Sequence, residues 1–403
     1  MFSSFTSRLQ EQVNTIKAVL DTHDRLRSII FRNAEPPKSP QTAGEHRAEQ
    51  EVEQAIDAVK RSAPSKPAWQ IYDHCAAFTR LYAVYEQFVE NLASEYLRML
   101  PRLYVRYEDL PPTVTTQHRV GVAQILQKIG KDGPFKDLEE RSIIRDLAHG
   151  LLGNPNYTLL RNAFLIDPQN YRSEIVNKLF SYLGFANSWV WVEKHPSMTA
   201  FMQSRRDPNE TAATLLHDFV EYRNEASHTL VDDIVATEEI KSIADFVVVL
   251  SEALSQLVMK NVVQRRNELG EVSTIGVVVH KFSDRIVGAR MSAGTVSIGT
   301  PLVVMQKQAC FKTRIESIKI LQKTYDHLEV EEDQEIGLGL TDIANEGARL
   351  LRLPPDEQPS PTPIIESLSP DDFPTQPENP TQLSPERPNN LESADPISPQ
   401  ESS

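Results

Sequence analysis

The six residues RNEASH at 223–228 bring together groups that can do chemistry. The guanidinium of Arg223 offers a fork of N–H donors that binds anions, and the imidazole of His228, with an ordinary pKa of about 6.5, can accept or release a proton near neutral pH. If residues 217–230 are helical, Arg223 follows the apolar residues Leu215 and Phe219 on one i, i+4 ridge of the helix. On the neighbouring ridge, Asn224 and His228 follow the apolar residues Leu216 and Val220. Polar groups on a core-facing stripe are costly unless they are partnered, so the arginine requires an anion, a carboxylate or a second subunit.

The same residues also have a purely structural interpretation. An arginine near a helix end can pair with a carboxylate, and a histidine there can satisfy the last carbonyl groups and the helix dipole. From these residue types alone, structure outweighs catalysis. The sequence has no GxxxxGK[ST], HExxH, GxSxG or paired CxxC pattern, and its two cysteines, Cys75 and Cys310, exclude a disulfide scaffold and leave almost no room for a cysteine-based metal site.

Glycine and proline separate the elements that must position these groups. Eight of the fifteen glycines lie between 270 and 347, and thirteen of the twenty-seven prolines follow Leu353, which leaves the first 269 residues poor in both, as long helices require. Apolar residues at three- and four-residue spacing predict one amphipathic helix from about Trp69 to Leu100 and another that starts at Thr237 as N-cap. Further helices are expected near 114–130, 137–152, 172–183 and 211–228.

From Ile275 the apolar period changes to two, and short runs rich in Val and Ile predict a small barrel or sandwich. From Pro354 the chain is rich in Pro, Ser and acidic residues, and it cannot bury enough surface to offset its chain entropy. We therefore expect a multidomain chain, α then β: an all-α helical bundle, then a small all-β barrel and a disordered tail. The expected boundaries are a helical N-terminal appendage at 1–62, a helical domain at 63–268, the barrel at 270–353 and the tail at 354–403.

The net charge of −14 is concentrated in that tail, which has ten acidic residues and one arginine and so accounts for −9. The remaining charge, near −5, neither favours nor excludes a nucleic-acid partner. The N-terminus lacks the apolar stretch of a signal peptide, and the most apolar segment, 246–259, is too short to span a bilayer. We expect a cytoplasmic protein with no membrane span.

The RNEASH run resembles the Arg-x(4–6)-His signature of the HEPN superfamily, with Asn224 in its usual place after the arginine. Residues 76–97, AAFTRLYAVYEQFVENLASEYL, resemble the early helix of stand-alone HEPN domains, and LFSYLGF at 179–185 resembles the helix end that precedes the motif helix. The likeness spans about residues 69–265. The chain departs from the family at Ser-His-Thr, 227–229, where Ala-His-Gly is frequent.

This resemblance implies a helical homodimer that brings two copies of the motif together. Members of the family are often metal-independent endoribonucleases, so the resemblance also implies a toxin or defence factor that needs no cofactor. Arg223 would then bind phosphate oxygens of tRNA, mRNA or rRNA, His228 would act as base or acid, and Asn224 would orient His228 or hold the phosphate. Glu86 is a candidate for supporting these groups, with a solvated or salt-bridged carboxylate as the simpler alternative. The family also contains non-catalytic modules that bind RNA or protein partners, and an antitoxin is a candidate partner.

Residues 271–353 resemble the second domain of translational GTPases such as elongation factor Tu, with Gly294 and Gly299 at expected turns. The nucleotide-binding domain that normally precedes it has no counterpart in this sequence, so the resemblance implies an accessory barrel that binds RNA or a translation-related partner. Four residues of a basic stretch are candidates for RNA binding, although outward lysines on a strand are also ordinary solvated side chains: Lys312, Arg314, Lys319 and Lys323.

Overall fold

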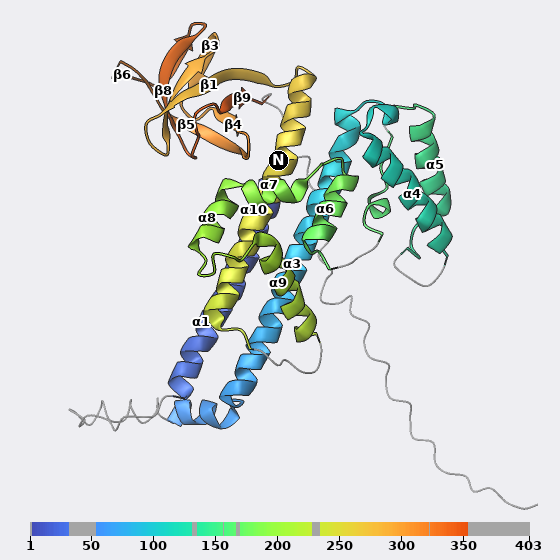
Figure 1. The fold of residues 1–403 in the computed structure, drawn as a ribbon, viewed down its shortest axis with the longest axis vertical. Coiled ribbons are helices and arrows are strands. Elements are labelled where there is room, and N and C mark those ends of the chain that lie inside the picture. Colours follow the sequence, from blue (N-terminus) through green and yellow to red (C-terminus); the bar gives the residue numbers. More distant parts are fainter. Residues whose placement is uncertain are drawn as a thin grey trace, which may run out of the picture. The chain divides into compact units, whose positions relative to one another are not determined.

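The computed structural model describes residues 2–31, 54–130, 135–155, 157–166, 170–227, 234–321 and 323–353. All of the described residues belong to one compact unit, which is bounded by Met1 and Asp356. Within this unit, helices come first and strands follow (Figure 1), which confirms the predicted order of a helical domain and a barrel. The expected disordered tail, 354–403, lies outside the described residues.

In the described ranges, the helical part contains three long helices and several short ones. Residues 54–62 are also helical, and two single 3-10 turns occur, η1 (Tyr107–Asp109) and η2 (Arg161–Ala163). The helices are α1 (Ser3–Ile30), α3 (Lys66–Leu103), α4 (Pro112–Lys128), α5 (Glu140–Leu151), α6 (Ser173–Tyr182), α7 (Ser188–Lys194), α8 (Pro196–Ser204), α9 (Ala212–Ala226) and α10 (Thr237–Glu268).

The two strongest helix predictions are confirmed as α3 and α10, with one correction. Ala236, not Thr237, is the N-cap of α10, and the Thr237 hydroxyl instead donates to Asp24 Oδ1 of α1 at 3.3 Å. The helices at 188–204 were not predicted. Both are a few turns long, and a pattern of period 3.6 needs more residues than that to stand out.

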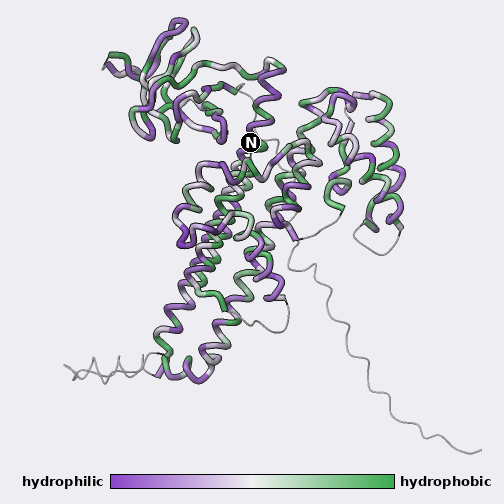
Figure 2. The backbone as a smooth tube through the Cα atoms, in the orientation of Figure 1, coloured by the Kyte–Doolittle hydropathy of each residue, from purple (hydrophilic) through white to green (hydrophobic). Residues whose placement is uncertain are grey.

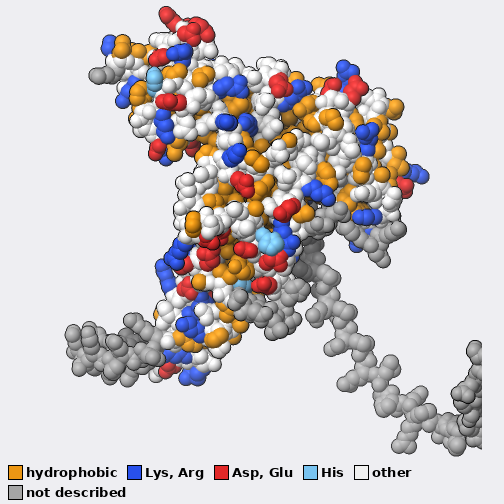
Figure 3. Space-filling view, in the orientation of Figure 1, with side chains coloured by type: hydrophobic (Ala, Val, Ile, Leu, Met, Phe, Trp, Pro, Cys, Tyr) orange, Lys and Arg blue, Asp and Glu red, His pale blue; other side chains and the backbone are white. Residues whose placement is uncertain are grey.

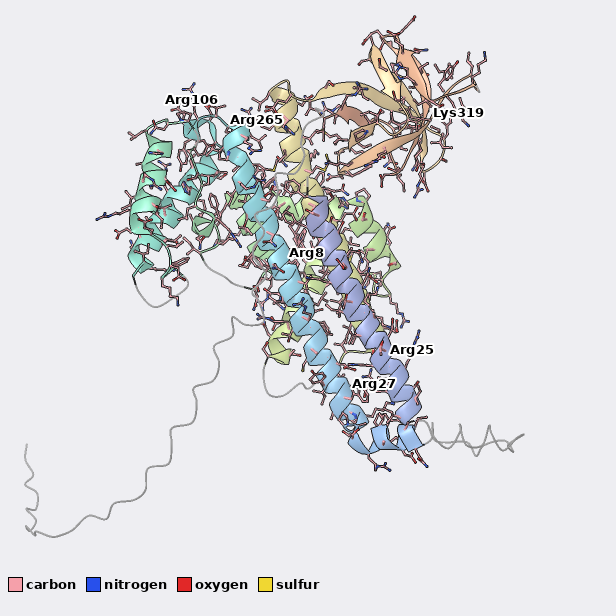
Figure 4. All side chains as sticks on the ribbon, turned by 180° about the vertical axis from the view of Figure 1, so that it is seen from behind. Arg8, Arg25, Arg27, Arg106, Arg265 and Lys319 are labelled. Atoms are coloured by element: carbon pink, nitrogen blue, oxygen red, sulfur yellow. The ribbon has the colours of Figure 1, made fainter. Side chains whose placement is uncertain are left out.

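α1, α3 and α10 lie side by side and form the main core (Figure 1). α1 lies in the segment that we predicted as an N-terminal appendage, and it buries Leu9, Val13 and Leu20 in this same core. Lys17 binds Asp245 of α10 at 2.7 Å, and Arg27 points toward α3 and pairs there with a buried aspartate (Figure 4). An amphipathic helix of this length must bury its apolar stripe, and the groove between α3 and α10 supplies the surface.

α10 is, in the described part of the chain, the one helix long and apolar enough to cross a membrane. Two thirds of its most apolar window, 67%, is buried, as in the core helix of a soluble protein. Hydrophobic and hydrophilic residues interchange along the helices, which fits amphipathic elements that each contribute one face to a core (Figure 2).

The strands close into a barrel in the order β4-β9-β1-β2-β8-β5, and β4 pairs with β5 to complete it. β6 extends the sheet beside β5, while β3 and β7 form a separate two-stranded sheet. Gly299 has a φ of 81° at a turn, as expected, and Gly339 packs so tightly that an added Cβ atom would lie 2.4 Å from Ser317 Oγ. The strands are β1 (Ser273–Lys281), β2 (Ile286–Met291), β3 (Gly294–Ser297), β4 (Pro301–Met305), β5 (Cys310–Ile320), β6 (Lys323–Tyr325), β7 (His327–Val330), β8 (Gln334–Leu340) and β9 (Arg349–Arg352).

Gly121 lets α4 approach η2, because a Cβ atom there would lie 2.1 Å from the carbonyl oxygen of Ala163. That oxygen accepts a hydrogen bond from Gln117 Nε2 at 2.9 Å, so it cannot move aside freely. We expect Gly121→Ala to lower the free energy of unfolding by about 1–3 kcal/mol, although alanine is the better helix former. Urea unfolding followed by circular dichroism measures this, with Ala123→Gly at an exposed position of α4 as control, expected to cost about 1 kcal/mol. A Gly121→Ala protein as stable as wild type contradicts the packing.

His118 of α4 is buried against the segment before η2, and this burial lowers the pKa of its imidazole to about 4. Its Nε2 accepts from the Leu160 amide at 3.0 Å, so the neutral ring is the form that fits. The unfolded chain binds the proton more readily, so stability is lost as the pH falls below the unfolded pKa, by about 2 kcal/mol between pH 7 and pH 5. Urea unfolding at both pH values should show a smaller loss for His118→Gln than for wild type. The exposed His217→Gln should keep the wild-type loss, and equal losses in all three proteins would refute this assignment.

Candidate functional site

The position of α9 against α3 is set by aromatic packing. Phe219 is fully buried, and its ring centre lies 6.2 Å from that of Phe78 and 6.0 Å from those of Tyr82 and Tyr85. A reciprocal capping box between Thr211 and Thr214 begins the helix. Because Phe219 fixes the rotation of α9, the residue one turn later on the same ridge must also face α3.

That residue is Arg223, and its half-buried guanidinium lies over the Tyr82 ring, with Cζ 4.5 Å from the ring centre. Its Nη1 donates to Asn170 Oδ1 and to Asn224 Oδ1, both at 3.1 Å. Among the described residues no carboxylate lies within ion-pair distance of it, so the described groups that hold the guanidinium are an aromatic ring and two amide oxygens. The structural interpretation of this arginine, as half of a carboxylate pair, therefore finds no support in the described part of the chain.

Asn224 is oriented by the same contacts. Its Oδ1 accepts from Arg223 and also from Asn170 Nδ2, at 3.2 Å, whereas its amide nitrogen donates to no residue in the described part of the chain. Asn170 comes from the segment before α6, where Arg172 pairs with Glu221 of α9. This ion pair ties that segment to α9 and so holds Asn170 against the arginine.

A polar chain on α3 extends this cluster. The Tyr82 hydroxyl accepts from the Tyr171 amide at 2.9 Å and donates to Glu86 Oε1 at 3.5 Å. Burial raises the pKa of Glu86, the nearby Glu90 raises it further, and the charge of Arg223 lowers it. Burial also raises the pKa of Tyr82 to about 12, so this hydroxyl keeps its proton and remains a donor. The structure thus brings Glu86 into the neighbourhood of Arg223.

His228 lies outside the described residues, which stop at Ser227 and resume at Ile234. From the sequence we considered residues 217–230 as one helix, with His228 on the ridge of Asn224. In the structure, α9 ends at Ala226. The Ser227 amide still bonds to the carbonyls of Arg223 and Asn224, and its hydroxyl donates to the Arg223 carbonyl at 3.0 Å. These bonds satisfy the last carbonyl groups of α9, and the predicted place of His228 on the ridge of Asn224 stays a prediction.

The four basic candidates of the barrel share the solvent side of β5 and β6. All are exposed, and alternation along β5 places buried Thr313 and Ile315 between the exposed side chains. Figure 4 marks Lys319 on this part of the barrel, and Figure 3 shows acidic side chains gathered at one end of the barrel. RNA binding by the four basic residues remains a prediction; they are Lys312, Arg314, Lys319 and Lys323.

Sequence reasoning missed the partners of Arg223. Asn170 and Tyr171 stand in a loop with no motif, and nothing local marks them. Tyr82 was recognised only as an apolar residue of the α3 stripe, although its spacing of four from Glu86 was visible in the sequence. Within the described ranges no group of three or more His, Cys, Asp and Glu side chains is arranged to hold a metal ion, and the expected independence from metals and cofactors stays a prediction.

Comparison with known proteins places this site within a family. A family model described as RiboL-PSP-HEPN matches residues 46–260, more than half of the chain. No curated protein matches it. Among solved structures, this chain is similar to the crystal structure of GDP-bound aIF5B from Aeropyrum pernix, with 17% sequence identity and a TM-score of 0.16. The aligned region covers 33% of this chain and 22% of that chain. The match thus spans about a fifth of that protein, and at this TM-score it establishes neither fold nor function.

The coupling between Arg223 and Glu86 can be measured directly. Since the arginine charge lowers the pKa of Glu86, Arg223→Gln should raise that pKa further, so that the carboxyl titrates at a higher pH than in wild type. Carbon-13 NMR titration of the Glu86 side chain gives the value. Arg145→Gln, which removes an exposed arginine of α5, serves as the matched control and should leave Glu86 unchanged. An unchanged Glu86 titration in Arg223→Gln would disprove the coupling.

Proposed function

Because the chain belongs to the RiboL-PSP-HEPN family, we propose that it is a metal-independent endoribonuclease with its active site at Arg223, Asn224 and His228. The observation that carries the proposal is the state of Arg223. Its guanidinium is fixed by an aromatic ring and two amide oxygens, and no carboxylate in the described part of the chain neutralises it. A positioned cation of this kind suits a phosphodiester, whose negative charge grows in the transition state.

The chemistry proposed is cleavage of RNA by its own 2′-hydroxyl. The 2′-oxygen loses its proton to a base and attacks phosphorus, while the 5′-oxygen of the next nucleotide leaves and takes up a proton. The products are a 2′,3′-cyclic phosphate and a 5′-hydroxyl, and no water or metal is consumed. In this proposal His228 moves one of these protons, and the remaining donors of Arg223 together with the Asn224 amide nitrogen bind the nonbridging oxygens.

Glu86 acts in this proposal as a positioning residue. It accepts from the Tyr82 hydroxyl, which also holds the Tyr171 amide, and the Tyr82 ring supports the guanidinium of Arg223. Loss of Glu86 would therefore loosen the arginine without removing a group that touches RNA.

Three finer statements belong to the same proposal. The protein acts as a homodimer, in which two copies of the motif face one RNA. It serves as a toxin or defence factor in the cytoplasm, controlled by an antitoxin. The barrel adds a second contact to RNA or to a translation-related partner through its exposed basic residues on β5 and β6.

The test is incubation of purified protein with tRNA and total RNA in the presence of EDTA, followed by analysis of the fragment ends. Wild type should produce 2′,3′-cyclic phosphate ends. His228→Ala and Arg223→Ala should each lower the cleavage rate by about 10²–10⁴-fold, since one removes proton transfer and the other removes charge stabilisation. Light scattering on the same samples gives the number of subunits.

The matched control is His217→Ala, an exposed histidine of the same helix α9, which should cleave at the wild-type rate. Uncut RNA with wild type, or equal rates for wild type and His228→Ala, would exclude catalysis at this site. The family membership would survive that result, and a non-catalytic module that binds RNA or protein would then be the function to pursue.

A further inference from the structure

A second site of concentrated positive charge lies away from α9, at the contact between α10 and the barrel. A cavity of about 430 Å³ opens there, lined by α10 on one side and by the end of β4, the turn after it and the start of β9 on the other. Three of its lining residues are cations: Lys260 of α10, Lys307 of the turn and Arg349 of β9. On the face drawn in Figure 3, Lys and Arg side chains are frequent around this junction.

α10 and the barrel are joined at this place by specific contacts. Val303, Cys310 and Leu351 of the barrel belong to the same core cluster as α10. The Cys310 amide donates to Gln256 Oε1 at 2.9 Å, and Cys310 is fully buried. The cavity is therefore bordered by packed structure on both sides.

Lys260 has only weak partners for its charge. Its Nζ donates to the Lys307 carbonyl at 2.7 Å and lies 4.6 Å from the ring centre of Trp191. Burial lowers the pKa of Lys260, while the Cys310 thiol raises it and the charge of Arg349 lowers it. The ammonium group thus loses hydration and feels a second cation, and its described partners are a carbonyl and an aromatic face.

Arg349 is in a similar position. Its Nη2 donates to Met305 Sδ at 2.9 Å, and a thioether sulfur is a weak acceptor. The acidic residue that lines the cavity, Glu268, already pairs with Arg265 at 3.0 Å. In the described part of the chain, neither Arg349 nor Lys260 has a carboxylate within ion-pair distance.

Two like charges that are partly withdrawn from water repel each other, and this arrangement becomes favourable when an anion lies between them. We propose that the cavity between α10 and the β4–β9 edge is a phosphate-binding site, in which Lys260 and Arg349 bind the phosphate oxygens. Arg349 offers planar paired donors and Lys260 a point charge, a combination that suits a tetrahedral oxyanion. This site is independent of the nuclease proposal, because it shares no residue with the α9 cluster.

The phosphate can come from a small molecule or from the RNA backbone, and two probes separate these sources. Isothermal titration calorimetry is carried out with inorganic phosphate, and separately with a short RNA that has hydroxyl groups at both ends. The RNA arm uses the full chain with His228→Ala, so that cleavage cannot affect the reading. Wild type should bind phosphate, and Lys260→Gln and Arg349→Gln should each weaken the affinity at least tenfold.

A chemical readout checks that binding occurs in this cavity. Acetylation of Lys260 by acetic anhydride, followed by mass spectrometry, should slow in the presence of phosphate but not in chloride of equal ionic strength. Lys260→Arg keeps the charge and should keep binding, which separates loss of the site from loss of the fold. Arg290→Gln, on the surface of β2, is the matched control and should bind like wild type.

The outcomes divide cleanly. Binding of inorganic phosphate that the two glutamine variants lose identifies a small phosphate compound as ligand. Binding of RNA alone, lost in the same variants, identifies the backbone phosphodiester. Absence of both, or equal binding by wild type and both variants, overturns the proposal. None of these results depends on whether His228 cleaves RNA.

Discussion

The candidate site depends on the packing of Phe219 among three aromatic rings of α3. This contact fixes the rotation of α9, and one helical turn later it brings Arg223 over the face of Tyr82. A guanidinium stacked on an aromatic ring loses little of its charge, since the ring interacts through its quadrupole and not through a formal negative charge. Core packing therefore positions a cation at the surface of the bundle without cancelling it.

The side chains that accept hydrogen bonds from this arginine are uncharged amides. Asn170 and Asn224 offer amide oxygens, which orient the guanidinium but do not neutralise it. Glu86 is hydrogen-bonded to Tyr82, and burial raises its pKa while the charge of Arg223 lowers it. The two amides add no negative charge beside the guanidinium, and an uncompensated cation is what an incoming phosphate group requires.

α10 connects the two halves of the described unit. Its apolar side chains complete the core formed with α1 and α3, and its last turns pack against the barrel through Gln256 and Cys310. One long helix thus forms part of the helical bundle that bears Arg223 and part of the wall of the cavity beside Lys260. The hydrophobic burial along α10 provides the rigidity that two polar sites need.

The sequence by itself determined the order of helices and strands, the family motif and the long helices α3 and α10. These are local properties: the period of apolar residues and the positions of glycine and proline reflect backbone preferences over short stretches. Even Glu86 was visible as a candidate, because it stands in the YEQF run of the segment that resembles the early helix of HEPN domains.

The tertiary structure decided what touches Arg223 and where α9 ends. Asn170 lies 53 residues away along the chain, and no local pattern encodes that contact. The end of α9 at Ala226 follows from the hydrogen bonds of Ser227, whereas apolar spacing alone continued the helix to residue 230. The packing of α1 into the main core likewise depends on contacts between residues far apart in the sequence. The apolar stripe of an amphipathic helix shows that one face must be buried, but it does not show which element buries that face.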